Sequence, residues 1–282
     1  MTADTAVTGA TGALGGLVAE LLAADAHPQR LLVRDAARAP KLAGATVATM
    51  DYSDRASCTR ALSGVSVVFL VSAPEGPNRL QQHRTVVDAA VTSGVAHVVY
   101  TSFLAAAPDS TFTLARDHAA TERYIVESGL DFTFLRDNFY IDFMETLIDS
   151  TGVIRGPAGN GRVSIVARAD IASAASAVLR APENHRSRTY ELTGREALTM
   201  ADIAATISEV RNRPVSFVDE TTDDAYRSRR HLQPPPWQLD AWVSTYSAIA
   251  SGELSPVRPD LERLTGRPPM TLREFLNQTR SR

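Results

Sequence analysis

The sequence of 282 residues contains little cysteine and lysine and no long apolar run. Cys58 is the only cysteine, which excludes an internal disulfide and a metal site built from several cysteines. Lysine and arginine together number 29, but only Lys41 is a lysine, so any reaction that requires a lysine has one candidate. No apolar run approaches the length of a membrane span, and the segment from Met1 to Asp4 lacks the charge pattern that opens a secretory signal.

The charge of the chain is nearly balanced, with a formal net charge of −3 and no block of one sign. A basic surface for nucleic acid or for an anionic membrane is therefore not expected. We expect a cytoplasmic protein that acts on a small molecule and holds no metal, and the sequence leaves its oligomeric state open. Hydrophobic residues make up 44% of the chain, enough for one large α/β domain or for a domain with a small appendage.

The first half of the chain alternates short apolar segments with helical ones. Strands rich in valine and leucine are expected at Thr5–Thr8, Arg30–Arg34, Thr46–Thr49, Val65–Val71, His97–Ser102 and Asp131–Leu135. Helices are expected at Leu14–Ala23, Ser57–Leu62, Asn78–Ser93 and Thr113–Ser128. This alternation predicts an α/β fold with a doubly wound parallel sheet of the Rossmann type and right-handed crossovers.

The second half has a looser rhythm with more turn residues. Helices are expected at Ala169–Leu179, Met200–Arg211 and Trp237–Ala250, and Thr199 is placed to cap the second of them. We predict an NAD(P)-binding domain over residues 1–137 and a smaller, more helical lobe over residues 138–282 that binds substrate. The chain is free to cross between the two.

A glycine-spaced turn follows the first expected strand, in the order Val7-Thr8-Gly9-Ala10-Thr11-Gly12-Ala13-Leu14-Gly15. Gly9 permits a tight turn, Gly12 lets backbone N–H groups approach phosphate oxygens, and Gly15 lets the next helix pack close to the sheet. The strand–turn–helix context favours a dinucleotide site over an ordinary glycine-rich turn. The expected cofactor contacts are Gly9, Ala10, Thr11, Gly12, Ala13, Leu14 and Gly15.

The end of the second strand indicates which dinucleotide binds. Arg34 stands where an arginine pairs with the 2′-phosphate of NADPH and where an acidic residue would favour NADH. Arg34 therefore favours NADPH over NADH, with a solvated charge pair of Arg34 and Asp35 that caps the next helix as the alternative. Asp51 follows the third strand, where its carboxylate could accept from the adenine amino group or cap the next helix.

Further segments carry a family resemblance. They are Asp51-Tyr52-Ser53-Asp54, Val71-Ser72-Ala73-Pro74-Glu75 with Arg79 and Gln82-His83-Arg84 after it, Tyr100-Thr101-Ser102, His118-Ala119-Ala120-Thr121-Glu122 and Leu135-Arg136-Asp137-Asn138-Phe139-Tyr140. Together with the glycine turn they resemble the atypical short-chain dehydrogenases of the NmrA-like group, in particular the type 2 NAD(P)H:quinone oxidoreductases. The resemblance covers most of the chain and implies an NADP-binding Rossmann domain.

The resemblance also implies cofactor contacts outside the glycine turn and Arg34. They are Ser72, Ala73, Pro74, Glu75, Asn138, Phe139 and Tyr140. Asp51, Tyr52, Thr101 and Ser102, which lie at the ends of other expected strands, are further expected cofactor contacts. The chain departs from the family at Pro74, where a small polar residue is usual, and at Asn138-Phe139, which replaces a common glycine–tryptophan pair. These departures leave the identity of the substrate open.

The chain lacks the Tyr-x-x-x-Lys pair with which most short-chain dehydrogenases protonate a carbonyl oxygen. Tyr100, Tyr124 and Tyr140 are not followed by lysine at that spacing, and Lys41 lies far from it. Hydride transfer to a quinone asks little of an acid, because the ring of the acceptor stabilises the oxyanion; the enzyme then supplies mainly positioning.

Two residues remain as catalytic candidates. His118 is a candidate proton donor, with hydrogen bonds to the backbone or to cofactor hydroxyls as the alternative. Tyr140 is a candidate for orienting the substrate, with a place in the core as the alternative. The sequence thus predicts an NADPH-dependent oxidoreductase that transfers hydride to a quinone-like or other conjugated small molecule. The alternative is an NmrA-like sensor that binds NADP without turnover.

Overall fold

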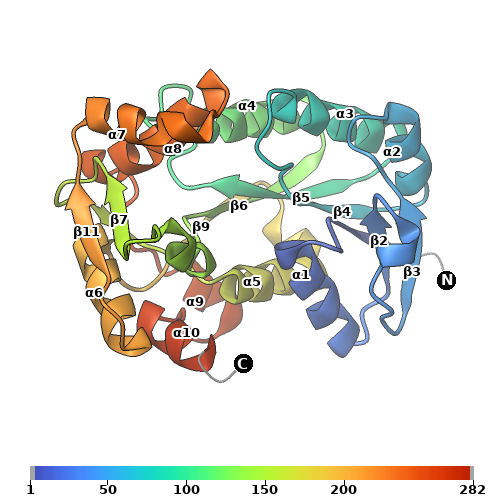
Figure 1. Cartoon of the computed structure of the whole chain (residues 1–282). Coiled ribbons are helices and arrows are strands. Elements are labelled where there is room, and N and C mark those ends of the chain that lie inside the picture. Colours follow the sequence, from blue (N-terminus) through green and yellow to red (C-terminus); the bar gives the residue numbers. More distant parts are fainter. Residues whose placement is uncertain (1–3, 280–282) are drawn as a thin grey trace. The chain divides into compact units, whose positions relative to one another are not determined.

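A computed structural model describes residues 4–279 of the chain, and Figure 1 shows its helices and strands. The chain divides into two compact units. The first comprises Met1–Phe103, Asp117–Arg136 and Ala169–Glu191, and the second comprises Leu104–Arg116, Asp137–Arg168 and Leu192–Arg282. These units differ from the predicted division at residue 137 in two segments, because the chain passes between the units repeatedly. Leu104–Arg116 belongs to the second unit, and Ala169–Glu191 belongs to the first.

The first unit is built on a sheet whose strand order is β3-β2-β1-β4-β5-β6-β9. The strands are β1 (Thr5–Thr8), β2 (Gln29–Val33), β3 (Ala45–Thr49), β4 (Val67–Leu70), β5 (His97–Phe103), β6 (Asp131–Asp137) and β9 (Arg188–Leu192). The pairs β1–β2, β2–β3, β1–β4 and β4–β5 are parallel. The order reverses between β1 and β4, and ligands of such sheets bind at the carboxyl ends of the strands beside this reversal.

Helices cover both faces of this sheet. They are α1 (Ala13–Ala24), α2 (Arg55–Leu62), α3 (Arg79–Thr92), α4 (Thr113–Glu127) and α5 (Arg168–Arg180), with short 3₁₀ turns η1 (Ala36–Arg38) and η3 (Pro182–His185). Figure 1 shows α2, α3 and α4 on one face and α1 and α5 on the other. The core beneath α2 and α3 includes Leu62, Val68, Val87, Val98 and Ile125. The predicted Rossmann-type sheet is confirmed, and each predicted element of the first half ends within two residues of the observed one.

The second unit has fewer and shorter strands than the first, and helices are its main elements. Its strands pair in twos, β7 (Val153–Gly156) parallel with β11 (Ser216–Asp219), and β8 (Arg162–Val163) antiparallel with β10 (Leu198–Thr199). Its helices are α6 (Met200–Arg211), α7 (Thr222–Arg229), α8 (Pro236–Ser251), α9 (Asp260–Thr265) and α10 (Leu272–Thr279), with 3₁₀ turns η2 (Ile141–Leu147) and η4 (Arg230–Leu232).

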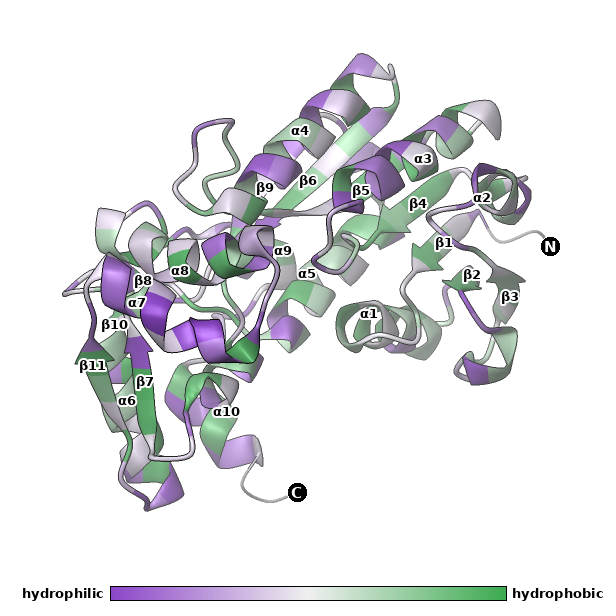
Figure 2. Ribbon diagram, turned by 45° about the horizontal axis from the view of Figure 1, so that its top comes forward, coloured by the Kyte–Doolittle hydropathy of each residue, from purple (hydrophilic) through white to green (hydrophobic). Residues whose placement is uncertain are grey.

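The helix signals of this unit differ in strength. Thr199 caps α6 as predicted, and Asp202 completes a capping box with it. No sequence pattern predicts α7, which is short and largely hydrophilic in Figure 2 and therefore shows no apolar period. Over residues 4–279 no helix is both long and apolar enough to cross a membrane.

Candidate cofactor site

The glycine turn between β1 and α1 leaves the start of the helix open. Gly9 adopts a φ of +63°, which favours glycine, and accepts a 2.8 Å hydrogen bond from the Gly12 amide. A Cβ on Gly15 would lie 2.4 Å from the Gly9 carbonyl oxygen, so only glycine fits there. In the described chain no side chain caps α1, and its first turn holds no acidic residue. The positive end of the helix therefore faces outward, which suits a pyrophosphate.

The exposed part of the glycine turn consists of backbone and small side chains. Thr11, Gly12 and Ala13 are exposed, whereas the side chains of Ala10 and Leu14 are buried. The Gly12 N–H already donates to the Gly9 carbonyl, so a diphosphate would meet the first-turn N–H groups of α1, which no intrahelical bond satisfies; the contacts of the individual residues stay predictions.

Arg34 follows the last residue of β2, on the edge of the sheet where β1 also ends. Its side chain is exposed. The neighbouring Asp35 is engaged elsewhere, because its carboxylate accepts a 2.9 Å hydrogen bond from the Ala37 amide and caps η1. The capping that the alternative assigns to this charge pair is thus observed for Asp35, while the Arg34 side chain is exposed and its pairing with a 2′-phosphate stays a prediction.

Asp51 and Tyr52 follow β3 and take different environments. The helix-cap alternative for Asp51 is wrong, because Asp54 caps α2 and Asp51 instead accepts from the Ser53 amide at 2.8 Å. Asp51 is exposed and remains a predicted adenine contact. The Tyr52 hydroxyl lies 2.6 Å from the Thr8 hydroxyl and 2.9 Å from the Val71 carbonyl, so it links the ends of β1 and β4. Burial raises the pKa of Tyr52, and the phenol stays protonated.

The loop after β4 carries four predicted contacts, Ser72, Ala73, Pro74 and Glu75. Pro74 and Glu75 are exposed, and Ala73 is buried. The Ser72 amide donates a 2.8 Å hydrogen bond to the hydroxyl of Thr101 in β5. Thr101 therefore supports this loop, and its direct contact with a cofactor stays a prediction.

Ser102 is fully buried next to an ion pair. Its hydroxyl donates a 2.5 Å hydrogen bond to Glu122, whose two carboxylate oxygens also accept from Arg136 at 2.8 and 2.6 Å. The hydroxyl of Ser102 is thus committed within the first unit, and its predicted cofactor contact remains untested.

His118 is buried, and both of its ring nitrogens have partners. Nε2 lies 2.7 Å from Arg79 Nη2, and Nδ1 lies 2.9 Å from the Tyr100 hydroxyl. A guanidinium only donates, so Nε2 must accept and the ring proton sits on Nδ1. Burial lowers the pKa of His118 well below its usual value, and the Arg79 charge lowers it further. Both partners are side chains rather than the backbone or cofactor hydroxyls of the predicted alternative, and a neutral ring with both nitrogens engaged is poorly placed to donate a proton to a substrate.

The remaining predicted residues belong to the second unit. The Asn138 amide donates to the Ser164 hydroxyl at 2.9 Å and to the Leu254 carbonyl at 3.0 Å, so its side chain braces that unit. Phe139 packs edge-to-face on Phe112 with ring centroids 5.2 Å apart.

Tyr140, also in the second unit, is held from two sides. Its hydroxyl donates to Asp137 at 2.6 Å, and the Arg168 guanidinium lies over its ring at 4.6 Å. The ring is half-buried. Tyr140 is therefore neither a plain core residue nor a free hydroxyl, and its role toward a substrate stays a prediction.

Arg79 and His83 belong to the segments that carry the family resemblance but have no predicted role, and the structure places them beneath the loop after β4. Arg79 is 5% exposed and His83 is 0% exposed. The available signal was their spacing of four on α3, which puts two polar side chains on one helix face together with Val86 and Val87.

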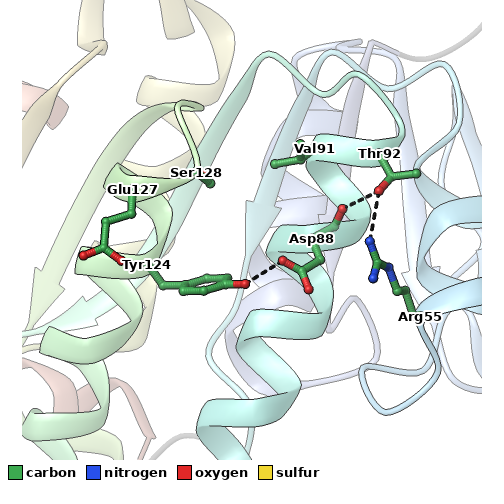
Figure 3. Close-up of a pocket in the computed structure, with 7 residues that line it drawn as sticks. All are labelled: Arg55, Asp88, Val91, Thr92, Tyr124, Glu127 and Ser128. Atoms are coloured by element: carbon green, nitrogen blue, oxygen red, sulfur yellow. Dashed lines mark hydrogen bonds between the residues drawn. The ribbon is translucent and has the colours of Figure 1, made fainter.

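A surface pocket of about 270 Å³ lies between α2, α3 and α4 (Figure 3). Across it the Tyr124 hydroxyl donates to Asp88 at 2.7 Å. Asp88 and Tyr124 lie in the last turns of their helices, at the edge of the sheet opposite the glycine turn, and no predicted site residue lines this pocket. Among residues 4–279 no group of acidic, histidine or cysteine side chains is arranged to hold a metal ion.

Comparison with known proteins gives a consistent picture. The sequence model of a family described as the NmrA-like family matches residues 1–228. Quinone oxidoreductase 2 of Escherichia coli (strain K12) is 34% identical over 279 residues, which cover 96% of this chain and 97% of that protein. An NAD(P)H azoreductase of Xenophilus azovorans is 34% identical over 277 residues, 95% of each chain.

Solved structures agree with these sequence matches. An NADPH-dependent quinone oxidoreductase of Escherichia coli, complexed with NADPH, matches with a TM-score of 0.88 and 33% identity over 98% of this chain and 99% of that one. A triphenylmethane reductase of Citrobacter sp., complexed with NADP(H), matches with a TM-score of 0.85 and 33% identity over 97% and 99% of the two chains.

Proposed function

Because the chain belongs to the NmrA-like family, we propose that it is an NADPH-dependent oxidoreductase that transfers hydride to a quinone-like or other conjugated small molecule. The observation that carries this proposal is the open N-terminus of α1 with the exposed Arg34 at the end of neighbouring β2. The similarity to a quinone oxidoreductase and to an azoreductase supports a conjugated small molecule as the acceptor. The proposed compartment is the cytoplasm, where the buried thiol of Cys58 stays reduced.

The first unit supplies the cofactor contacts in this proposal. The first-turn N–H groups of α1 hold the diphosphate, and Arg34 pairs with the 2′-phosphate. Asp51 would accept from the adenine amino group, and the loop from Ser72 to Glu75 would supply further contacts to the cofactor. NADPH, when bound, supplies the hydride.

The protein contributes positioning rather than a strong acid. The chain has one lysine, Lys41, and no tyrosine four residues before it, so no Tyr-x-x-x-Lys pair is present. His118 is neutral and engaged on both nitrogens, and we assign it a supporting role. Solvent then protonates an anion that the conjugated acceptor itself stabilises. Tyr140 is the proposed orienting residue for the acceptor.

The proposal is tested with purified protein, NADPH and a panel of quinones and azo dyes. Loss of the absorbance of the reduced nicotinamide measures turnover, and the fluorescence of bound NADPH measures affinity separately. We expect binding and acceptor-dependent oxidation. Tight binding with no oxidation across the panel would favour the sensor alternative, and absence of NADPH binding would refute both functions.

A further inference from the structure

The loop after β4 is held from beneath by two buried side chains of α3. The Ala73 amide donates a 2.8 Å hydrogen bond to His83 Nε2, and Arg79 Nε donates a 3.0 Å hydrogen bond to the Ala73 carbonyl. Ala73 is 4% exposed, as buried as the two side chains that hold it. Both polar backbone groups of this loop residue are therefore fixed by side chains.

A second layer fixes the orientation of His83. Its Nδ1 lies 2.8 Å from the hydroxyl of Thr121, which donates its own proton to the Asp117 carbonyl at 2.8 Å. The Ala73 amide can only donate, so His83 Nε2 accepts and the ring proton sits on Nδ1, pointing at Thr121. His83 is thus a neutral ring with one permitted tautomer.

Arg79 is fixed in the same manner. It donates to His118 Nε2 at 2.7 Å. Its Nη1 also forms an ion pair with Asp117 Oδ2 at 3.5 Å, and the Asp117 side chain is 32% exposed. Arg79 is 5% exposed, and its partners include the Ala73 carbonyl, His118 Nε2 and the Asp117 carboxylate, so the orientation of its guanidinium is set from several sides.

The clamped loop adjoins the glycine turn. A Cβ on Gly9 would contact the Val71 side chain at 3.5 Å, and the Ser72 amide is tied to Thr101. We propose that Arg79 and His83 are positioning residues for NADPH, because they fix the Ala73 peptide and so pre-shape the loop from Ser72 to Glu75 before the cofactor arrives. A loop that is already ordered costs less conformational entropy on binding. This inference rests on the proposed function of the first unit.

The amide side chains of asparagine and glutamine separate the two nitrogens of His83. In His83→Gln the amide oxygen reaches the position of Nε2 and can accept from the Ala73 amide. In His83→Asn the amide reaches only the position of Nδ1, so the contact with Thr121 survives and the Ala73 N–H is left unpaired. We expect His83→Asn to raise the Kd for NADPH about tenfold, the effect of one unpaired buried donor, and His83→Gln to recover most of that loss.

The matched control is His97→Asn. His97 is 2% exposed and bonds Thr133 through Nε2 at 2.8 Å, but it begins β5 and so lies at the opposite edge of the sheet. We expect this variant to lower the urea midpoint as His83→Asn does while leaving the Kd for NADPH at the parent value. Equal Kd values for NADPH in His83→Asn, His83→Gln and the parent would refute the positioning role of His83.

The design separates failure of the clamp from failure of the proposed function. If the parent protein does not bind NADPH, the proposed function fails. If the parent binds NADPH and the variants bind it equally well, only the positioning role is refuted. If His83→Asn does not fold, Thr121→Val decides, because it removes the acceptor of His83 Nδ1 at almost constant volume. Its Kd should rise about threefold with kcat retained, and an unchanged Kd would refute the positioning role.

Discussion

Replacing Arg34 with alanine should weaken the binding of NADPH much more than that of NADH. The side chain is exposed at the end of β2, and its neighbour Asp35 is committed to the Ala37 amide. The substitution therefore removes a cation from the edge of the sheet without releasing a new carboxylate into the site. NADH lacks the 2′-phosphate and serves as the internal reference.

The magnitude follows from the exposure of Arg34. A hydrogen bond to a charged group contributes about 1.5–3 kcal/mol, and an exposed site belongs at the lower end because water and salt screen the charge. A loss of about 1.5 kcal/mol corresponds to a Kd for NADPH that is about tenfold higher. The effect should shrink as the salt concentration rises.

The assay is titration of each variant with both cofactors, followed by the fluorescence of the bound nicotinamide. Arg38→Ala is the matched control, because Arg38 is an exposed arginine in η1 and its loss changes the net charge equally. The reasoning fails if Arg34→Ala weakens NADPH and NADH alike, or if Arg38→Ala reproduces its effect.

Three further predictions concern the same unit. Gly15→Ala should abolish NADPH binding and cost about 1–3 kcal/mol in urea unfolding, because its Cβ would press on backbone oxygens, whereas Gly16→Ala, with its nearest such atom at 3.4 Å, should be tolerated. Ser102→Ala should lower stability by about 1 kcal/mol through its lost bond to Glu122 and leave kcat unchanged in steady-state assays; a collapse of kcat would instead mean that Ser102 takes part in the reaction. Burial, together with the Arg79 charge, lowers the pKa of His83 to about 3, below its unfolded value of about 6.5. The contribution of His83 to stability is therefore complete above the unfolded pKa. On acidification between these two pKa values, the free energy of unfolding should fall by about 1.4 kcal/mol per pH unit. Urea midpoints across that window should fall less steeply in His83→Gln, and identical slopes would contradict the assignment.

Local sequence signals located the elements and the cofactor turn. The strands β1, β4 and β5 are buried along their whole length, so their composition marks them. Gly9 and Gly15 are required by backbone geometry within one turn. Arg34 follows from its place at a strand end. The alternative for Asp51 needed the structure, because Asp51 and Asp54 are both suitable caps and only the hydrogen bond from Ser57 identifies Asp54.

The sequence by itself determined the alternating fold, the glycine cradle and the absence of a Tyr-x-x-x-Lys pair, because each depends on residues close together in the chain. Only the tertiary structure decided what the buried polar residues do. His118 meets Arg79 and Ser102 meets Glu122 across 39 and 20 residues of sequence. A hydrogen-bond partner at such a separation is chosen by how helices pack on the sheet, which no local pattern encodes.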